Sequence, residues 1–369
     1  MDANTWKSAA LGAATLLLAA CGGEKATPTL EDRLAEALAQ EPDARGFAVA
    51  VETPSGLRNA AVGDAGPDGR ALTATTPVRI ASVTKTFVAA TVLRLHERGE
   101  IGLDAPIGSL LNPDLENILS TDGYDTSAIT VRHLLMHVGG LPDHADGSFG
   151  EIVGADPQQA WSRRDQVALL IEEHEPLGPP GVSFHYSDTG YVLLGDIVER
   201  LAEAPLASIV RKEMQFDRIG LRETWWESVE TPPAGAAPRA HQHLDGADIY
   251  DWSPTIDLYG GGGLVSSPRD LARFYAALFG GEILERPETL DLMTTAPGHP
   301  EPDEYRIGLF PGNAHGVEIF AHGGFWGLWA AYAPEHEIAA AGVVLDQAGY
   351  RALRDLLKDE IASEAASDR

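Results

Sequence analysis

Strand-like patterns near both ends of the chain, with helical patterns between them, strongly restrict what this sequence can fold into. A buried-strand run at 47–51 and a second run at 60–62 are separated by a turn, which predicts a hairpin. An apolar helix follows from Ser82 to Arg98, and the segment from Leu103 to about Asp251 is mostly helical. Three strand patterns and a final helix then complete the chain, at 317–321, 328–333, 338–345 and 350–362. The sequence therefore predicts an α+β fold in which an antiparallel sheet, flanked by helices, carries an inserted helical subdomain.

The first twenty residues are typical of a targeting segment. An apolar run at 9–20 follows Lys7 and is too short to span a bilayer comfortably. The run ends in Leu-Ala-Ala-Cys-Gly, which resembles a bacterial lipobox, and Cys21 is the only cysteine of the chain. We therefore expect residues 1–20 to be a lipoprotein signal peptide and Cys21 to carry a lipid, with an ordinary secretory signal as the alternative. The mature protein would be anchored by that lipid in a bacterial cell envelope, facing the periplasm or the exterior.

The rest of the chain divides into a short leading segment and one large domain. Residues 21–43 are interpreted as a tether and an N-terminal helix, and residues 44–365 as the domain. Within it, we expect an α/β part at about 44–98 plus 258–365 and a helical part at about 99–257.

The charge of the chain limits its partners. A formal net charge of −28 argues against nucleic acid and against unaided binding to anionic lipid, so any membrane contact would come through the lipid anchor. With a single cysteine, no disulfide can form within the chain. The expected partner is instead a small-molecule or peptide substrate, and the oligomeric state is not predicted.

Ser82-Val83-Thr84-Lys85 is the strongest chemical signal. A serine and a lysine three residues apart share one face at the start of a helix, so the amine can reach the hydroxyl. A serine becomes a good nucleophile when a nearby base takes its proton. The chain has only five lysines, and arginine supplies nearly all of its other positive charge. A lysine at this position is therefore less readily explained as an ordinary solvent-exposed surface residue.

Three other segments carry polar groups suited to a reaction centre. Tyr186-Ser187-Asp188 precedes an apolar helix, and His322-Gly323-Gly324 follows a strand, where two glycines let backbone approach closely. A third segment at 132–142 has His133 and His137 four residues apart, but no third ligand is evident, and we expect no metal. The glycine run 260–263 lacks the lysine of a phosphate loop and more simply lets backbone pass close to the site.

Together these motifs resemble the serine β-lactamase and penicillin-recognising enzyme superfamily, in the branch of class C β-lactamases, D-alanyl-D-alanine carboxypeptidases and related esterases. The resemblance runs from about Phe47 to the last strand, with the motifs in the family's order. It implies a serine hydrolase that cleaves an amide or ester through an acyl-enzyme and needs no cofactor.

The same resemblance implies a role for each matching residue. Ser82 would be the acylated nucleophile, Lys85 its proton-transfer partner, and Tyr186 a general base that later acts as an acid. The backbone N–H groups of Ser82 and Phe325 would form the oxyanion hole, where each donor is commonly worth about 3 kcal/mol of barrier. The remaining positions, in substrate binding or behind the catalytic groups, would be Asp188, His322, Gly323 and Gly324.

Two of these residues depart from the family's usual pattern. Asp188 stands where asparagine is usual; a carboxylate there favours a charged Lys85, shifts the burden of deprotonating Ser82 to Tyr186 and repels a substrate carboxylate. His322 stands where lysine is usual, and an imidazole is only partly charged at neutral pH.

Both changes favour an esterase or relaxed amidase over an efficient β-lactamase, with a catalytically silent envelope-binding homologue as the alternative. Asp188 could also simply cap the helix that follows it. We expect pocket selectivity to come from the loops at 143–156 and 231–251, and Trp326 either to wall the acyl pocket or to pack in the core.

Overall fold

The computed structural model describes residues 28–367, so Cys21 and the expected signal peptide lie outside the described residues. Its main sheet consists of β1 (Gly46–Thr53), β2 (Gly56–Gly63), β8 (Phe310–Ala314), β9 (Val317–Gly324), β10 (Leu328–Ala333) and β11 (Ile338–Val344). The strand order is β2-β1-β11-β10-β9-β8, and every neighbouring pair is antiparallel. Strands from the two ends of the chain meet where β1 pairs with β11. The predicted fold class is confirmed.

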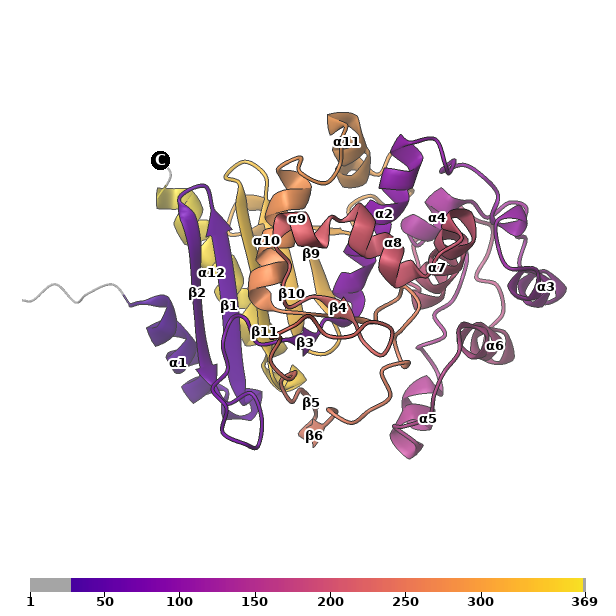
Figure 1. Cartoon of the computed structure of the whole chain (residues 1–369). Coiled ribbons are helices and arrows are strands. Elements are labelled where there is room, and N and C mark those ends of the chain that lie inside the picture. The colour runs from indigo at the N-terminus through magenta and orange to yellow at the C-terminus, as the bar shows by residue number, and fades with distance from the viewer. Residues whose placement is uncertain (1–27, 368–369) are drawn as a thin grey trace, which may run out of the picture.

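Helices cover both faces of this sheet (Figure 1). α1 (Leu30–Gln40) and α12 (Tyr350–Ser367) pack on one face, and α10 (Pro268–Phe279) packs on the other. Because side chains alternate along a strand, Val49 enters the core beneath α1 and α12, whereas Ala48 enters the core beneath α10. The sheet is therefore the middle layer of three.

The central strand β11 consists mostly of small residues, and this lets α12 lie close to the sheet. A Cβ atom built on Gly342 would come within 2.8 Å of Leu353 Cδ1 and within 3.0 Å of Leu357 Cδ1, both on α12. This close packing fixes the position of α12 on the sheet, including the face of the helix that is turned toward β9.

The helical part lies beyond the β8 edge of the sheet, and α2 (Thr84–Glu97) lies between the two (Figure 1). Two small sheets, β3-β7-β4 and β5-β6, accompany the helices, with strands β3 (Val78–Arg79), β4 (Trp225–Trp226), β5 (His243–Leu244), β6 (Ala247–Asp248) and β7 (Leu264–Ser266). No helix within residues 28–367 has the length and apolar character needed to cross a membrane. The remaining helices are α3 (Pro113–Thr121), α4 (Val131–Leu135), α5 (Phe149–Ala155), α6 (Arg163–Glu173), α7 (Asp188–Ala202), α8 (Leu206–Glu213), α9 (Phe216–Ile219) and α11 (Pro287–Thr295).

Besides the short strands β3 to β7, which were not predicted, the strands β8 and β9 next to the site differ from the sequence prediction. β8 was not predicted, because Pro311, Gly312 and Asn313 hide its strand pattern, yet it pairs along β9 at the edge of the sheet. β9 is also longer than expected: it continues through His322 to Gly324, which pair with β10. The residues predicted to follow a strand are therefore part of one, and their backbone positions are fixed by the sheet.

Candidate active site

Ser82 and Lys85 lie where the sheet meets the helical part. Ser82 belongs to a short 3₁₀ turn (Ala81–Val83) that leads directly into α2, so the chain is wound more tightly at Ser82 than the predicted continuous helix. The Lys85 Nζ donates to Ser82 Oγ at 2.9 Å and to the backbone carbonyl of Gly261 at 2.6 Å. The glycine run thus passes next to Lys85, as the sequence predicts.

Lys85 is held as an ammonium ion. Its side chain is fully buried, and its Nζ lies 2.5 Å from Asp188 Oδ1. Burial alone lowers the pKa of Lys85, but the negative charge of Asp188, together with hydrogen bonding, outweighs burial and raises that pKa above its usual value. The ammonium donates to the Ser82 hydroxyl and the Gly261 carbonyl, and it forms an ion pair with the Asp188 carboxylate. The expectation that Asp188 favours a charged Lys85 is confirmed.

Asp188 faces Lys85 and does not cap the helix that follows. The cap of α7 is Ser187, whose Oγ accepts from the backbone N–H of Gly190 at 3.3 Å, while Asp188 is the first residue of the helix. The interpretation of Asp188 as the cap is therefore wrong, because the residue before it supplies the capping oxygen. Asp188 Oδ1 forms an ion pair with Lys85, but the geometry of this contact is not that of a hydrogen bond. Asp188 Oδ1 is buried and has no hydrogen-bond partner.

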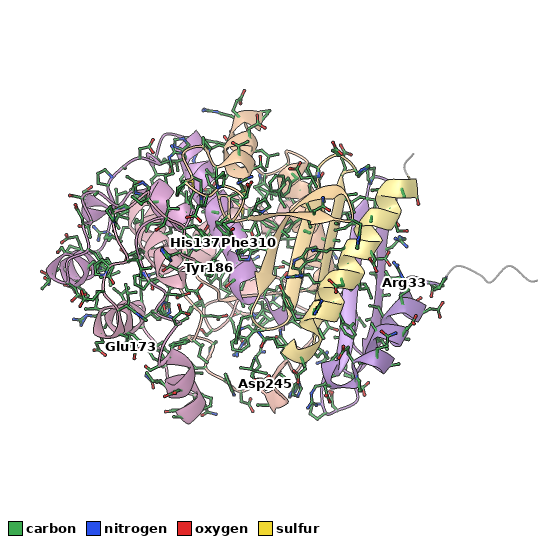
Figure 2. The ribbon with its side chains drawn as sticks, turned by 180° about the vertical axis from the view of Figure 1, so that it is seen from behind. Arg33, His137, Glu173, Tyr186, Asp245 and Phe310 are labelled. Carbon is green, nitrogen blue, oxygen red and sulfur yellow. The ribbon has the colours of Figure 1, made fainter. Side chains whose placement is uncertain are left out.

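Tyr186 lies beside Ser82 and Lys85. The Lys85 Nζ lies 5.0 Å from the centre of the Tyr186 ring. Burial raises the pKa of the Tyr186 phenol, and the positive charge of Lys85, with hydrogen bonding by Lys85 and Ser82, offsets part of that effect, leaving a pKa of about 12. The ring of His137 packs against Tyr186 with 4.3 Å between ring centres, and Figure 2 places both beside Phe310 where the sheet meets the helical part.

His322 is neutral and already occupied by protein partners. Its Nδ1 donates to the carbonyl of Gly323 at 2.8 Å, so its Nε2 accepts from the Tyr305 hydroxyl at 3.1 Å. Burial, with a smaller effect from the charge of Lys85, lowers the pKa of His322 to about 3. The expected partial charge at neutral pH is therefore wrong. His322 supports the pocket wall, and it cannot replace a lysine as a receptor for a substrate carboxylate.

The two glycines after His322 are required by close contacts. A Cβ atom on Gly323 would lie 2.2 Å from the Tyr350 hydroxyl, and one on Gly324 would lie 2.3 Å from the carbonyl of Ile80. The strand end and the turn that carries Ser82 therefore meet backbone against backbone. The next residue, Phe325, lines both pockets together with Ser82. The role of its backbone N–H in an oxyanion hole stays a prediction.

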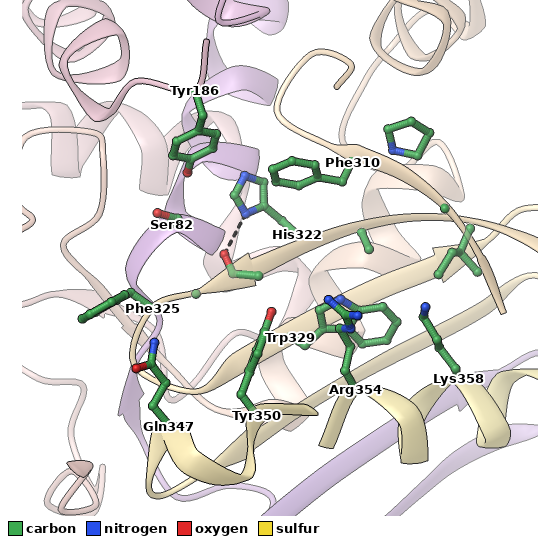
Figure 3. Close-up of a pocket in the computed structure, with 16 residues that line it drawn as sticks. Ser82, Tyr186, Phe310, His322, Phe325, Trp329, Gln347, Tyr350, Arg354 and Lys358 are labelled. Carbon is green, nitrogen blue, oxygen red and sulfur yellow. Dashed lines mark hydrogen bonds between the residues drawn. The ribbon is translucent and has the colours of Figure 1, made fainter. Parts of the chain in front are cut away.

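A cleft of about 550 Å³ opens on one side of Ser82 (Figure 3). Tyr186, Phe310 and His322 form its inner wall, and α12 contributes residues that the sequence analysis missed. Tyr350, Arg354 and Lys358 are spaced four residues apart, so they share one face of that helix, and all three line the cleft. The spacing of these three residues is visible in the sequence. The sequence does not show that this face of α12 is turned along β9 toward Ser82.

A second pocket, of about 360 Å³, shares Ser82, Tyr186 and Phe325 with the cleft. Its walls include Asp143, Phe149 and Val153 from the loop and helix after α4, Leu244 and Trp252 from the segment after α9, and Trp326. The two loops named by the sequence analysis therefore do reach a pocket. Trp326 lines that pocket and donates its indole N–H to Asp257 at 3.0 Å.

The two histidines of the 132–142 segment have structural partners. His133 Nδ1 accepts from the backbone N–H of Thr130 at 3.2 Å, which completes a capping box for α4. His137 Nδ1 accepts from the backbone N–H of Ser187 at 3.1 Å, next to Tyr186. Within residues 28–367 no group of three or more histidine, cysteine, aspartate or glutamate side chains is arranged to hold a metal ion.

Comparison with known proteins was made at the level of families, sequences and structures. A family model described as Beta-lactamase matches residues 32–363. The chain is 23% identical over 218 residues to the D-alanyl-D-alanine-carboxypeptidase/endopeptidase AmpH of Escherichia coli (strain K12), covering 59% of this chain and 53% of that protein. It is 34% identical over 175 residues to the esterase EstB of Burkholderia gladioli, covering 46% of this chain and 43% of EstB. The matches thus span about half the length of these curated relatives.

Among solved structures, a D-stereospecific amidohydrolase from Streptomyces sp. superposes with a TM-score of 0.75 at 25% sequence identity. The superposition covers 90% of this chain and 98% of the amidohydrolase. Unlike the sequence matches, this likeness extends over almost the whole of both chains.

Proposed function

The chain belongs to the Beta-lactamase family of serine hydrolases, and on this premise we propose that it cleaves an amide or ester bond through an acyl-enzyme on Ser82. The observation that carries the proposal is the 2.9 Å contact between Lys85 Nζ and Ser82 Oγ, at a serine that borders both pockets. The relatives that act on D-alanyl peptides, on esters and on D-amino-acid amides support the same reaction class.

In the proposed reaction, Ser82 Oγ bonds to the substrate carbonyl carbon while the Tyr186 oxygen takes the Ser82 proton. The backbone N–H groups of Ser82 and Phe325 stabilise the negative oxygen that forms. The tetrahedral intermediate then expels an amine or alcohol, which receives the proton from Tyr186, and an ester on Ser82 remains. Water repeats the sequence: Tyr186 takes its proton, the ester bond breaks, and Ser82 is reprotonated as the carboxylic acid leaves. Lys85 stays an ammonium throughout and stabilises the deprotonated oxygens of Ser82 and Tyr186.

The test is mass spectrometry of the intact protein after incubation with three probes: a penicillin, a D-Ala-D-Ala peptide and a short-chain p-nitrophenyl ester. We expect at least one of them to leave an acyl group whose mass maps to the peptide containing Ser82. Turnover of the ester with an adduct on a different residue would reject the assignment.

The pH dependence of the reaction follows from Tyr186. The base is the deprotonated phenol, and a pKa near 12 leaves only a small deprotonated fraction at neutral pH. That fraction grows as the pH rises, so we expect kcat/KM for a p-nitrophenyl ester to increase by about tenfold for each pH unit between neutral and mildly alkaline conditions. In Tyr186→Phe, kcat/KM should fall about 10²- to 10⁴-fold and lose this slope. A flat profile in the parent protein over that range would rule out Tyr186 as the free-enzyme base.

A second candidate substrate class is a peptide that ends in a carboxylate. The supporting observation is the pair of cations on α12, Arg354 and Lys358, which line the cleft beyond His322. We expect Arg354→Gln to lower the preference for a peptide with a free carboxylate over the same peptide as a carboxamide, by about three- to tenfold in the ratio of kcat/KM values. The matched control is Arg351→Gln, on the same helix with a side chain 92% exposed. An unchanged ratio in Arg354→Gln would remove this candidate.

We also propose that the mature protein is attached to the cell envelope by a lipid on Cys21. The support is the apolar run at 9–20 and the Leu-Ala-Ala-Cys-Gly motif. In cells fed labelled palmitate, the full-length protein should take up label and sediment with membranes, and Cys21→Ala should do neither. Membrane association without label would instead indicate an ordinary signal or another form of attachment.

A further inference from the structure

The second pocket combines apolar walls with carboxylates that lack a cation. Four aspartates line it, Asp143, Asp146, Asp188 and Asp257, while no lysine, arginine or histidine side chain within residues 28–367 does so. The nearest cation, Lys85, is already paired with Asp188 at 2.5 Å. The pocket wall beside Ser82 therefore offers a ligand several carboxyl groups and no cation of its own among the described residues.

Asp143 is the carboxylate that most needs a partner. Its side chain is only 10% exposed, and among the described residues its one ion-pair contact is with His144, at 3.8 Å between His144 Nδ1 and Asp143 Oδ1, while the charge of Lys85 acts on it from farther away. His144 is not a cation at neutral pH, because burial lowers its pKa to about 4. The protein supplies Asp143 with the backbone N–H of Ala145, which donates to Oδ1 at 3.0 Å. A buried carboxylate with so little compensation is costly for the fold unless a ligand brings a positive charge.

The electrostatic state of Asp143 agrees with this geometry. Burial, together with the nearby charge of Asp188, raises the pKa of Asp143 to about 8. Asp146 belongs to the same turn, since its backbone N–H donates to the Asp143 carbonyl at 3.2 Å. The buried atom Asp188 Oδ1, which lacks a hydrogen-bond partner, belongs to a third carboxylate lining the same space. A pKa near 8 leaves Asp143 mostly protonated in the empty pocket at neutral pH, so a cation entering the pocket would favour its ionised form and pair with it.

Aromatic side chains also line the pocket, together with aliphatic ones such as Leu244 and Ile256. Phe149, Trp252 and Trp326 surround the pocket, and the rings of Trp252 and Trp326 stand nearly perpendicular with 6.1 Å between their centres. Aromatic faces attract cations and pack well against apolar side chains. The pocket therefore suits a group that is apolar in bulk and carries one positive charge close to the scissile bond.

We propose that this pocket binds the protonated amine of the substrate, so that the enzyme acts on amides or esters of amino acids whose α-amine is free and whose side chain is apolar. In such molecules the ammonium lies one carbon from the carbonyl that Ser82 attacks, and the apolar side chain branches from the same carbon. Asp143, with Asp146, is the specificity residue for the amine. The inference rests on the proposed function for the position of the carbonyl, but not for the binding of the amine itself.

The first experiment measures binding without any reaction. Calorimetry compares 2-phenylethylammonium with its neutral counterpart 2-phenylethanol on the whole protein at neutral pH. We expect the ammonium to bind at least about tenfold more tightly, because hydrogen bonds to charged groups are the stronger kind. Equal affinities for the two probes would overturn the proposal even if the protein proves to be an active hydrolase.

The second experiment uses variants and a substrate pair. The ratio of kcat/KM for phenylalanine p-nitroanilide over its N-acetyl derivative should exceed one in the parent. In Asp143→Asn the ratio should fall about tenfold. Asp146→Asn, an exposed loop position that does not threaten folding, should lower the ratio in the same direction, and Asp217→Asn, 96% exposed and away from the pocket, serves as the control. A ratio that stays the same in both pocket variants would reject Asp143 and Asp146 as the amine receptor.

The two experiments separate the inference from the proposed function. Hydrolysis through Ser82 with no preference for the free amine rejects the inference alone. Tight, Asp143-dependent binding of 2-phenylethylammonium in a protein that hydrolyses none of the substrates and forms no adduct on Ser82 rejects the proposed reaction and supports the amine site.

Discussion

In Ser82→Ala, covalent labelling by a fluorophosphonate should disappear and ester hydrolysis should fall by about 10³-fold or more. The physical reason is that the reaction needs an oxygen at this position to form the acyl bond, and Ser82 is the serine whose hydroxyl accepts from the Lys85 Nζ. The measurement is in-gel fluorescence of the labelled protein together with initial rates on a p-nitrophenyl ester.

The matched control for this experiment is Ser55→Ala. Ser55 is exposed in the turn between β1 and β2, away from both pockets, so labelling and rate should be those of the parent. Circular dichroism would show that Ser82→Ala remains folded. Undiminished labelling of a folded Ser82→Ala protein would mean that the nucleophile lies elsewhere.

In Lys85→Met, both activity and stability should fall. The rate should drop about 10²- to 10⁴-fold, because the positive charge that stabilises the deprotonated Ser82 and Tyr186 oxygens is lost. The free energy of unfolding should fall by about 3 kcal/mol, because the Asp188 carboxylate loses its cation while most of it remains buried. Urea denaturation followed by tryptophan fluorescence measures the second effect.

The double variant Lys85→Met, Asp188→Asn separates these two effects. With the carboxylate gone, no uncompensated charge remains, so most of the lost stability should return while the rate stays low. If the double variant were as unstable as Lys85→Met, the loss would come from packing around the buried side chain and not from the charge of Asp188. Recovery of the rate together with stability would show that Lys85 only holds the fold.

How much of this site could be predicted depends on how far apart in the chain its parts lie. Ser82 and Lys85 are one helical turn apart, so local geometry alone brings them together. Tyr186 and His322 could be named only through the resemblance to a known superfamily, because no local rule relates them to Ser82. The neutral state of His322 could not be predicted at all: it depends on Tyr305, seventeen residues away, and on burial by elements from the whole chain.

The same reasoning explains the residues that the sequence analysis did not find. Arg354 and Lys358 are exposed or half-buried cations on a helix, a pattern that usually means a solvated surface. Asp143 follows a proline in a loop, where a carboxylate is ordinary turn chemistry. Arg354 and Lys358 line a pocket because α12 packs on the sheet, and Asp143 lines one because the loop after α4 packs beside α7. Both are contacts between distant parts of the chain.

The backbone contact between Gly324 and Ile80 has a consequence for how this enzyme can change over evolution. At the base of the site, the end of β9 lies directly against the turn that carries Ser82. No side chain lies between the two backbones, so no substitution there can make the pocket larger or smaller. New substrate preferences therefore have to arise in the walls, through insertions and exchanges in the surrounding loops and on the outer face of the last helix. We therefore expect the backbone contact of Gly324 with Ile80 to be retained in related enzymes, while the surrounding loops and the outer face of α12 vary.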